Sequence, residues 1–141
     1  MNDTGTRSSS RLLPLLHAAH AAEAAVEAEL STVGLSLAKA LALKALADAD
    51  DPLPLSQLAE RLSCVRSNVT QLVDRLEADG LVVRQGDPRD RRARLAALTA
   101  AGRKAHLDAT RVQQQVERRV LSTLTKEESA QLMALLTKFG A

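Results

Sequence analysis

The sequence predicts a mainly α-helical protein that carries one small β-hairpin. The clearest helix signal lies between residues 69 and 76, where apolar side chains recur every three or four residues. After Gly80 the pattern changes to two extended, β-branched segments around a turn. Aromatic residues make up only 1% of the 141 residues, so the core must consist of Leu, Val and Ala. A core of this kind suits closely packed helices, and the length suits one domain.

Two helices are predicted near the N-terminus. Residues 1–10 are polar, and we expect them to be disordered. The next helix, from Leu12 to about Leu30, has the apolar spacing of a helix–helix seam, at Leu12, Leu15, Ala19, Ala22 and Val26. Gly34 ends it. A second helix is predicted over residues 36–47, with its inward face at Leu37, Leu41 and Ala45.

Two shorter helices follow, separated by a tight turn. Residues 48–54 (DADDPLP) form a turn with stop signals at both prolines. A third helix is predicted over residues 55–62, with Ser56 as its N-cap. Residues 63–65 turn into a fourth helix, whose apolar stripe consists of Val69, Leu72, Val73 and Leu76. Two short helices in this arrangement form a helix-turn-helix, in which the second helix reads DNA.

A hairpin is predicted directly after the fourth helix. Gly80 stops the helix, since glycine carries no penalty at positive φ. Residues 81–84 and 94–98 have the composition of strands, and Gly86-Asp87-Pro88 is the expected turn. The connecting segment is basic, with Arg89, Arg91 and Arg92. The complete pattern predicts a winged helix-turn-helix core.

The C-terminal third is predicted to hold two further helices. Thr99 is the expected N-cap of a long helix that reaches about Leu121, and residues 125–128 form a capping box for a helix to about Lys138. Together with the first helix they carry more apolar side chains than the winged helix can cover, which indicates a partner subunit. We therefore expect a single domain over residues 11–141. Its dimerisation helices are 12–34 and 99–141, and its winged, DNA-binding part is 35–98.

Charge is concentrated in the segment that contains the fourth helix and the hairpin. The whole chain has 19 basic and 17 acidic residues, a net charge of +2. Residues 61–94 contain eight arginines and five acidic residues, so this segment alone is +3. Arginine suits phosphate groups and narrow minor grooves. A local basic stripe on a nearly neutral chain favours a binder of duplex DNA.

The segments VTQLVDRLEADGLVVR and DPRDRRARLAALTAAGR are similar to the reader helix, wing and following helix of the MarR (multiple antibiotic resistance regulator) family of bacterial transcription factors. The agreement in motifs covers roughly residues 55–104. The resemblance implies an obligate homodimer on a pseudo-palindromic operator. It also implies reader helices in consecutive major grooves and wings at the minor groove. Many members release DNA when a small lipophilic ligand binds between the dimer region and the winged helix, so a repressor relieved by such an effector is expected.

The candidate DNA-binding residues lie on the fourth helix and the wing. By position in the family, Ser67, Asn68, Thr70 and Gln71 contact bases and phosphates. Helical spacing alone turns Ser67, Gln71 and Asp74 away from the apolar stripe. The full candidate set is Arg66, Ser67, Asn68, Thr70, Gln71, Asp74, Arg75, Arg89, Arg91 and Arg92. Gln71 stands where the family more often has Arg, and glutamine pairs best with adenine. Val65 replaces a usual capping residue, so the helix is expected to start at Ser67 or to use Ser63.

Sensing residues are less clearly marked. Cys64 is the one cysteine, which fits a reducing cytoplasm, and packing is favoured over a redox role because no Lys or His lies near it in sequence. His17 and His20 could share a metal or line a cleft, and the cleft is favoured because structural zinc needs four ligands. A redox-responsive or metal-responsive regulator remains an alternative. We predict no cofactor and no bound metal.

Other classes of function fit the sequence less well. An enzyme is not favoured, because there is no nucleophile–base pair and no glycine-rich phosphate loop. A winged-helix adaptor that binds protein is the main alternative, but such a surface should expose Leu, Met or aromatic residues where this helix is polar. No secretory signal or long apolar span is evident, so we expect a cytoplasmic protein without membrane contact.

Overall fold

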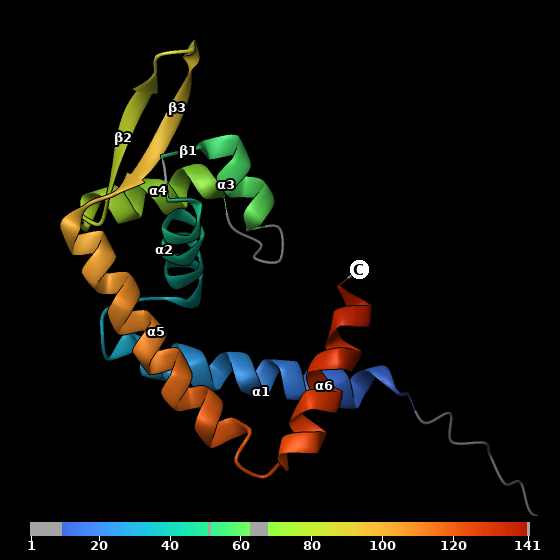
Figure 1. Cartoon of the computed structure of the whole chain (residues 1–141). Helices are drawn as coiled ribbons and strands as arrows, with labels where there is room; N and C mark the ends of the chain where they lie inside the picture. The colour runs from blue at the N-terminus through green and yellow to red at the C-terminus, as the bar shows by residue number, and fades with distance from the viewer. Residues whose placement is uncertain (1–9, 51, 63–67, 141) are drawn as a thin grey trace, which may run out of the picture.

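The computed structural model describes residues 10–50, 52–62 and 68–140. Helices α1 and α5 meet at one end of the molecule, and a slender hairpin projects from the other end (Figure 1). A three-stranded antiparallel sheet of order β1-β3-β2 carries the hairpin. In chain order the elements are α1 (Leu12–Ser31), α2 (Leu37–Ala49), β1 (Leu53–Pro54), α3 (Leu55–Arg61), α4 (Val69–Ala78), β2 (Val82–Asp87), β3 (Asp90–Leu98), α5 (Ala100–Val120) and α6 (Lys126–Phe139).

The sequence predicts the two N-terminal helices well, but it misjudges the buried face of α2. Helix α1 ends at Ser31 and Gly34 follows with φ +74°, as expected. The Ser36 side chain caps α2 by accepting from the Lys39 amide. Leu37 and Leu41 are only partly buried, while Ala45 lies in the core as predicted, with Ala40, Ala42, Leu43 and Leu46. Because α2 packs against α1, α3, α4, α5 and β3, a single apolar stripe cannot describe its buried surface.

The segment before α3 differs from the prediction in two ways. Part of the predicted turn is strand β1, in which Leu53 pairs with Ala96 and Pro54 with Leu95. Helix α3 then starts at Leu55, and its N-cap is Pro54 rather than Ser56. Ser56 was the wrong cap because the strand continues to Pro54, which leaves the serine inside the first helical turn. Proline is tolerated in β1 because this strand lies at the edge of the sheet.

The wing is longer and its turn tighter than predicted. Strand β2 continues to Asp87, and strand β3 begins at Asp90. The turn therefore consists of Pro88 and Arg89 instead of residues 86–88. The register shifts between Gly86 and Asp87, which shows a bulge near the tip. Arg91 and Arg92 therefore lie on the start of β3 and not in the turn. Gly86 and Asp87, whose composition predicted a turn, lie at this bulge instead.

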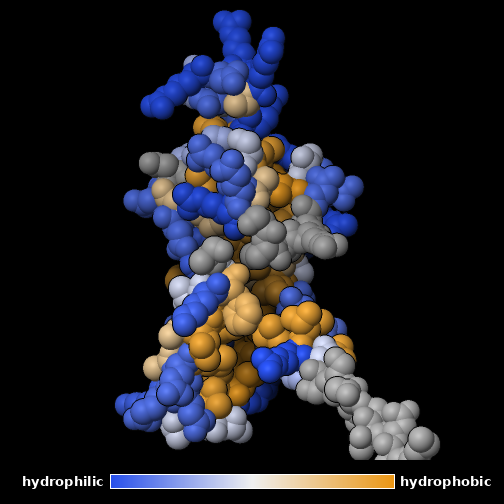
Figure 2. All heavy atoms as spheres, turned by 90° about the vertical axis from the view of Figure 1, so that its right-hand side faces the viewer, coloured by the Kyte–Doolittle hydropathy of each residue, from blue (hydrophilic) through white to orange (hydrophobic). Residues whose placement is uncertain are grey.

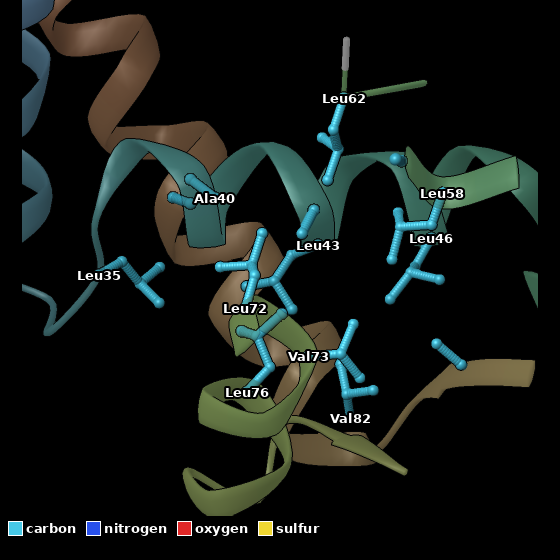
Figure 3. Close-up of a cluster of buried hydrophobic side chains, with 14 of the residues drawn as sticks. Leu35, Ala40, Leu43, Leu46, Leu58, Leu62, Leu72, Val73, Leu76 and Val82 are labelled. Atoms are coloured by element: carbon cyan, nitrogen blue, oxygen red, sulfur yellow. The ribbon is translucent and has the colours of Figure 1, made fainter. Parts of the chain in front are cut away.

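Among the described residues, the hydrophobic core consists of aliphatic side chains. Leu43 from α2, three residues of α4 and Val82 from β2 pack together at the centre (Figure 3). The three α4 residues are Leu72, Val73 and Leu76, which lie on the predicted stripe. The buried hydrophobic residues are all Leu, Ala or Val, as the near absence of aromatic residues requires.

A compact junction joins α4, the predicted reader helix, to α5. Gly80 has φ +75°, and Thr99 Oγ1 donates to its carbonyl oxygen at 2.7 Å. The Thr99 amide donates to the Leu81 carbonyl oxygen at 3.1 Å, and Thr99 caps α5 by accepting from the Gly102 amide. The start of α5 is thereby fixed to the end of α4, through backbone groups of both segments.

Helix α6 is capped as predicted but has little to pack on. Thr125 accepts from the Glu128 amide at 3.1 Å. No described residue of α6 is buried, and Phe139 is 72% exposed. Within the described ranges, no helix has both the length and the apolar character needed to cross a membrane.

Candidate nucleic-acid interface

Helix α4 has a buried apolar face and an exposed polar face. Leu72, Val73 and Leu76 point into the core. The opposite side is exposed and carries the predicted DNA-binding residues Asn68, Thr70, Gln71, Asp74 and Arg75. Their hydrogen-bonding groups suit the base edges and walls of a major groove. The predicted residues Arg66 and Ser67, and Cys64 in the preceding turn, lie outside the described residues.

The start of α4 is fixed by Asn68. Its side-chain Oδ1 accepts from the Thr70 amide at 3.0 Å and from the Gln71 amide at 3.3 Å. Asn68 is therefore the N-cap, one residue after the predicted start at Ser67. Asparagine is among the best capping residues, and this explains how the helix starts without a Ser or Thr at position 65. The side-chain carbonyl group accepts from the helix amides, which leaves the side-chain NH₂ group as a donor at the exposed start of α4.

Loss of this cap should be measurable. We expect Asn68→Ala to lower the free energy of unfolding by about 1 kcal/mol, because two amides of α4 lose their acceptor. Asn68→Ser keeps an acceptor and should remain close to the parent in urea unfolding. An Asn68→Ser variant as unstable as Asn68→Ala would contradict the capping role.

The structure reveals an ionic cluster that joins the wing to α4. Arg84 Nη2 lies 2.6 Å from Asp74 Oδ1, and its Nη1 lies 3.2 Å from Glu77 Oε1. Arg84 Nη2 also donates to the Thr70 carbonyl oxygen, and the Arg84 amide donates to Glu77 Oε2. The hydrogen bond to Asp74 raises the pKa of Arg84, against partial desolvation. Asp74 was predicted to face DNA, and its carboxylate is held in an ion pair at the edge of that face.

Sequence analysis did not single out Arg84, although a signal was present. In a strand, alternate side chains lie on the same face. Val82 is fully buried, so Arg84 must turn to the same side, toward α4. There the side chain remains only 21% exposed. A long cation at an inward strand position requires partners, and the acidic residues of α4 provide them.

The arginines of the wing project into solvent. Arg89, Arg91 and Arg92 are exposed, and no ion pair involves them among the described residues. The neighbouring carboxylates accept hydrogen bonds from backbone amides. Asp87 accepts from the Arg89 amide, and Asp90 accepts from the Arg92 amide, both at 2.9 Å. Their oxygens stabilise the turn, and the guanidinium groups are left available for phosphates or a minor groove.

A polar hollow lies beside the reader helix. Its volume is about 230 Å³, and Gln71 and Arg75 line one side of it. The other side belongs to the first turn of α2, with Ser36 and Lys39. Lys39 Nζ also lies 2.7 Å from Asp79 Oδ2 at the end of α4. The sequence did not point to these α2 residues, because only the folded chain brings them next to α4.

Two of the predicted sensing residues, His17 and His20, lie in the described ranges and are exposed on α1. Within residues 10–50, 52–62 and 68–140, no cluster of three His, Cys, Asp or Glu side chains is arranged to hold a metal ion.

Comparison with known proteins identifies relatives. A sequence profile of the MarR family matches residues 33–93. YkoM of Bacillus subtilis, described as an uncharacterised HTH-type transcriptional regulator, is 39% identical over 95 residues, which are 63% of this chain and 58% of that protein. The chain thus spans less than two thirds of the length of this curated relative.

Solved structures match over nearly the whole chain. A probable transcriptional regulator from Pseudomonas aeruginosa superposes with a TM-score of 0.83 at 26% identity, covering 93% of this chain and 97% of that one. A MarR variant from Escherichia coli, crystallised with operator DNA, gives a TM-score of 0.82 at 26% identity and covers 91% and 92% of the two chains. With the winged helix and the flanking helices both matched, the chain is similar in fold and sequence to the MarR family of winged-helix transcriptional regulators.

Proposed function

We propose that this protein is a sequence-specific DNA-binding regulator that acts as a homodimer and is released from its operator by a small ligand. One observation carries the proposal: the polar face of α4 and the exposed arginines of the wing lie at the same end of the molecule. Hydrophilic side chains dominate that end, whereas apolar ones gather at the opposite end over α1 and α6 (Figure 2). The MarR variant crystallised with operator DNA supports this assignment by its similarity.

In the proposed complex, α4 enters the major groove and the wing reaches the flanking minor groove. Asn68, Thr70 and Gln71 lie at the N-terminal end of α4, the part of a recognition helix that approaches base edges. Arg75 and the wing arginines lie where phosphates pass on either side. Two half-sites about one helical turn apart would match the two-fold axis of a dimer.

The test is a selection of bound fragments from random or genomic DNA, with the parent and with Gln71→Ala. We expect the parent to return an inverted repeat, and the variant to lose the preference at one base pair per half-site. Glutamine can pair with adenine through two hydrogen bonds, which are worth about 1–3 kcal/mol of discrimination.

Binding of the Gln71→Ala variant to unrelated DNA should stay nearly unchanged, and this serves as the internal control. A variant that returns the motif of the parent would mean that Gln71 contacts only phosphate. A parent protein that enriches no motif would reject sequence-specific DNA binding itself.

The apolar ends of the chain support the homodimer. Leu12, Leu16 and Phe139 are all more than half exposed, on helices from the two ends of the sequence. The exposed side chains of α6 include Met133, Leu135 and Leu136. A patch of this kind on a chain of this size marks an interface with another subunit.

Sedimentation at micromolar concentration should give twice the monomer mass. Leu135→Glu with Leu136→Glu places two charges in the proposed interface and should shift the protein to the monomer. The matched control is Lys44→Glu with Arg61→Glu, exposed on α2 and α3 outside the proposed dimerisation helices, which should remain dimeric. A monomeric parent would contradict the proposal.

A cavity between the helices provides a place for the proposed effector. It has a volume of about 320 Å³ and lies between α1, the start of α2 and the C-terminal half of α5. Val26, Leu37 and Val116 line it, with Gln113 and Glu117 as its polar groups. Its aliphatic wall suits an apolar ligand. The position between the flanking helices and α2 would allow the ligand to act on the winged helix.

A further inference from the structure

The wing and the reader helix are separate elements that must meet the same duplex. Beyond the buried Val82 and Ala96, the hairpin projects as a two-stranded ribbon with exposed ends. A ribbon of two strands is only marginally stable alone and can bend or twist. Its orientation relative to α4 therefore depends on contacts near its base.

Arg84 makes those contacts. Its side chain reaches three positions of α4: the carbonyl oxygen of Thr70 at 3.2 Å, Asp74 at 2.6 Å and Glu77 at 3.2 Å. These positions lie about 10 Å apart along the helix axis, from first to last. In addition, a hydrogen bond from the Arg84 backbone amide to Glu77 Oε2 at 3.0 Å holds the strand backbone to the same helix. Only the guanidinium fork can serve several acceptors at once in a fixed geometry.

We propose that Arg84 is a positioning residue that sets the angle between the wing and the reader helix, so that both reach the DNA together. The inference rests on the proposed DNA-binding function and adds a residue that need not touch DNA. Arg84 also neutralises two carboxylates beside the binding face, which would otherwise repel phosphates. The two effects can be separated, because one concerns geometry and the other charge.

The first test is Arg84→Lys, which keeps the charge and removes the fork. Hydroxyl-radical footprinting reports the minor groove where the wing lies, and dimethyl sulfate protection reports guanines in the major groove. We expect the protection by the wing to disappear while the protection by α4 remains at saturating protein. Operator affinity should fall about tenfold, which corresponds to about 1.4 kcal/mol.

Arg111→Lys on α5 is the matched control. Arg111 also pairs with an aspartate, Asp108, at 3.3 Å, but far from the wing, so both footprints should match the parent. Arg84→Lys with the minor-groove protection intact would overturn the inference. Loss of both protections together would also overturn it, since Arg84 would then maintain α4 itself.

A second variant removes the partners and leaves the arginine in place. Asp74→Ala with Glu77→Ala deletes two negative charges near the phosphates, so electrostatics alone predicts tighter binding and an unchanged footprint. Positioning predicts that the wing protection is lost, as in Arg84→Lys. Tighter binding with an intact footprint would overturn the inference. If the parent protects no DNA in either assay, the proposed function fails rather than this inference.

Discussion

Gly102→Ala is expected to destabilise the protein, although alanine is the better helix former. Position 102 lies in the first turn of α5 and is buried against Leu81, in the segment between α4 and β2. A Cβ there would fall inside the contact distance of the Leu81 carbonyl oxygen, 3.0 Å from the Leu81 carbonyl carbon and 3.2 Å from Leu98 Cδ2. Backbone atoms cannot rotate away, so α5 must move. We expect a net loss of about 2 kcal/mol after the propensity gain of about 1 kcal/mol.

The measurement is urea unfolding at one fixed protein concentration, because the stability of a dimer depends on concentration. Gly86→Ala is the matched control, since a Cβ at position 86 meets no atom within 4 Å. Its unfolding free energy should stay within about 0.5 kcal/mol of the parent. A Gly102→Ala protein as stable as the parent would show that α5 does not approach Leu81 as closely as described.

Arg91→Ala with Arg92→Ala is expected to weaken operator binding about thirtyfold for each half-site, at about 1 kcal/mol for each arginine. The reason is that both guanidinium groups project from β3 without an ion pair among the described residues, so they are free to displace counterions from phosphates. In a titration of affinity against salt, the logarithmic slope should decrease in magnitude by about one unit for each phosphate that the wing no longer binds.

Arg111→Ala with Arg118→Ala removes the same charge from the exposed side of α5 and should leave the salt slope unchanged. Circular dichroism of both double variants should match the parent, since these arginines pack on nothing buried. If the wing variant retains the slope of the parent, the wing arginines take no part in phosphate binding.

The elements with regular periodicity were predicted correctly from the sequence. The apolar stripe of α4 and the caps at Thr99 and Thr125 appear in the structure because each depends on residues within a few positions. Strand β1 was missed because its two residues are strand only through their pairing with β3, more than forty positions away. The buried face of α2 was misjudged for a related reason, since five elements surround this helix.

The same limit applies to the candidate site. Reader-helix and wing residues could be named from local sequence, and those in the described ranges are exposed at one end of the molecule. The hollow beside α2 depends on contacts between segments and could not be predicted from either one. Strand alternation indicates the inward position of Arg84, but its acidic partners on α4 are set by the fold. The actual cap, Asn68, could have been predicted from the sequence, because asparagine before an apolar helix is a common start signal.

The junction at Thr99 and Gly102 should transmit a tilt of α5 to α4. Because backbone bonds and close packing hold the start of α5 to Gly80 and Leu81, directly after α4, we expect a movement of α5 to be passed on to α4. Helix α5 has 21 residues and is therefore about 31 Å long. A tilt of about 10° at its far end, where α1 packs beside the proposed ligand cavity, would displace α4 by about 5 Å over that length. In the proposed dimer this would exceed the rise of about 3.4 Å between successive base pairs, so a small change near the cavity would move the two reader helices out of register with their half-sites.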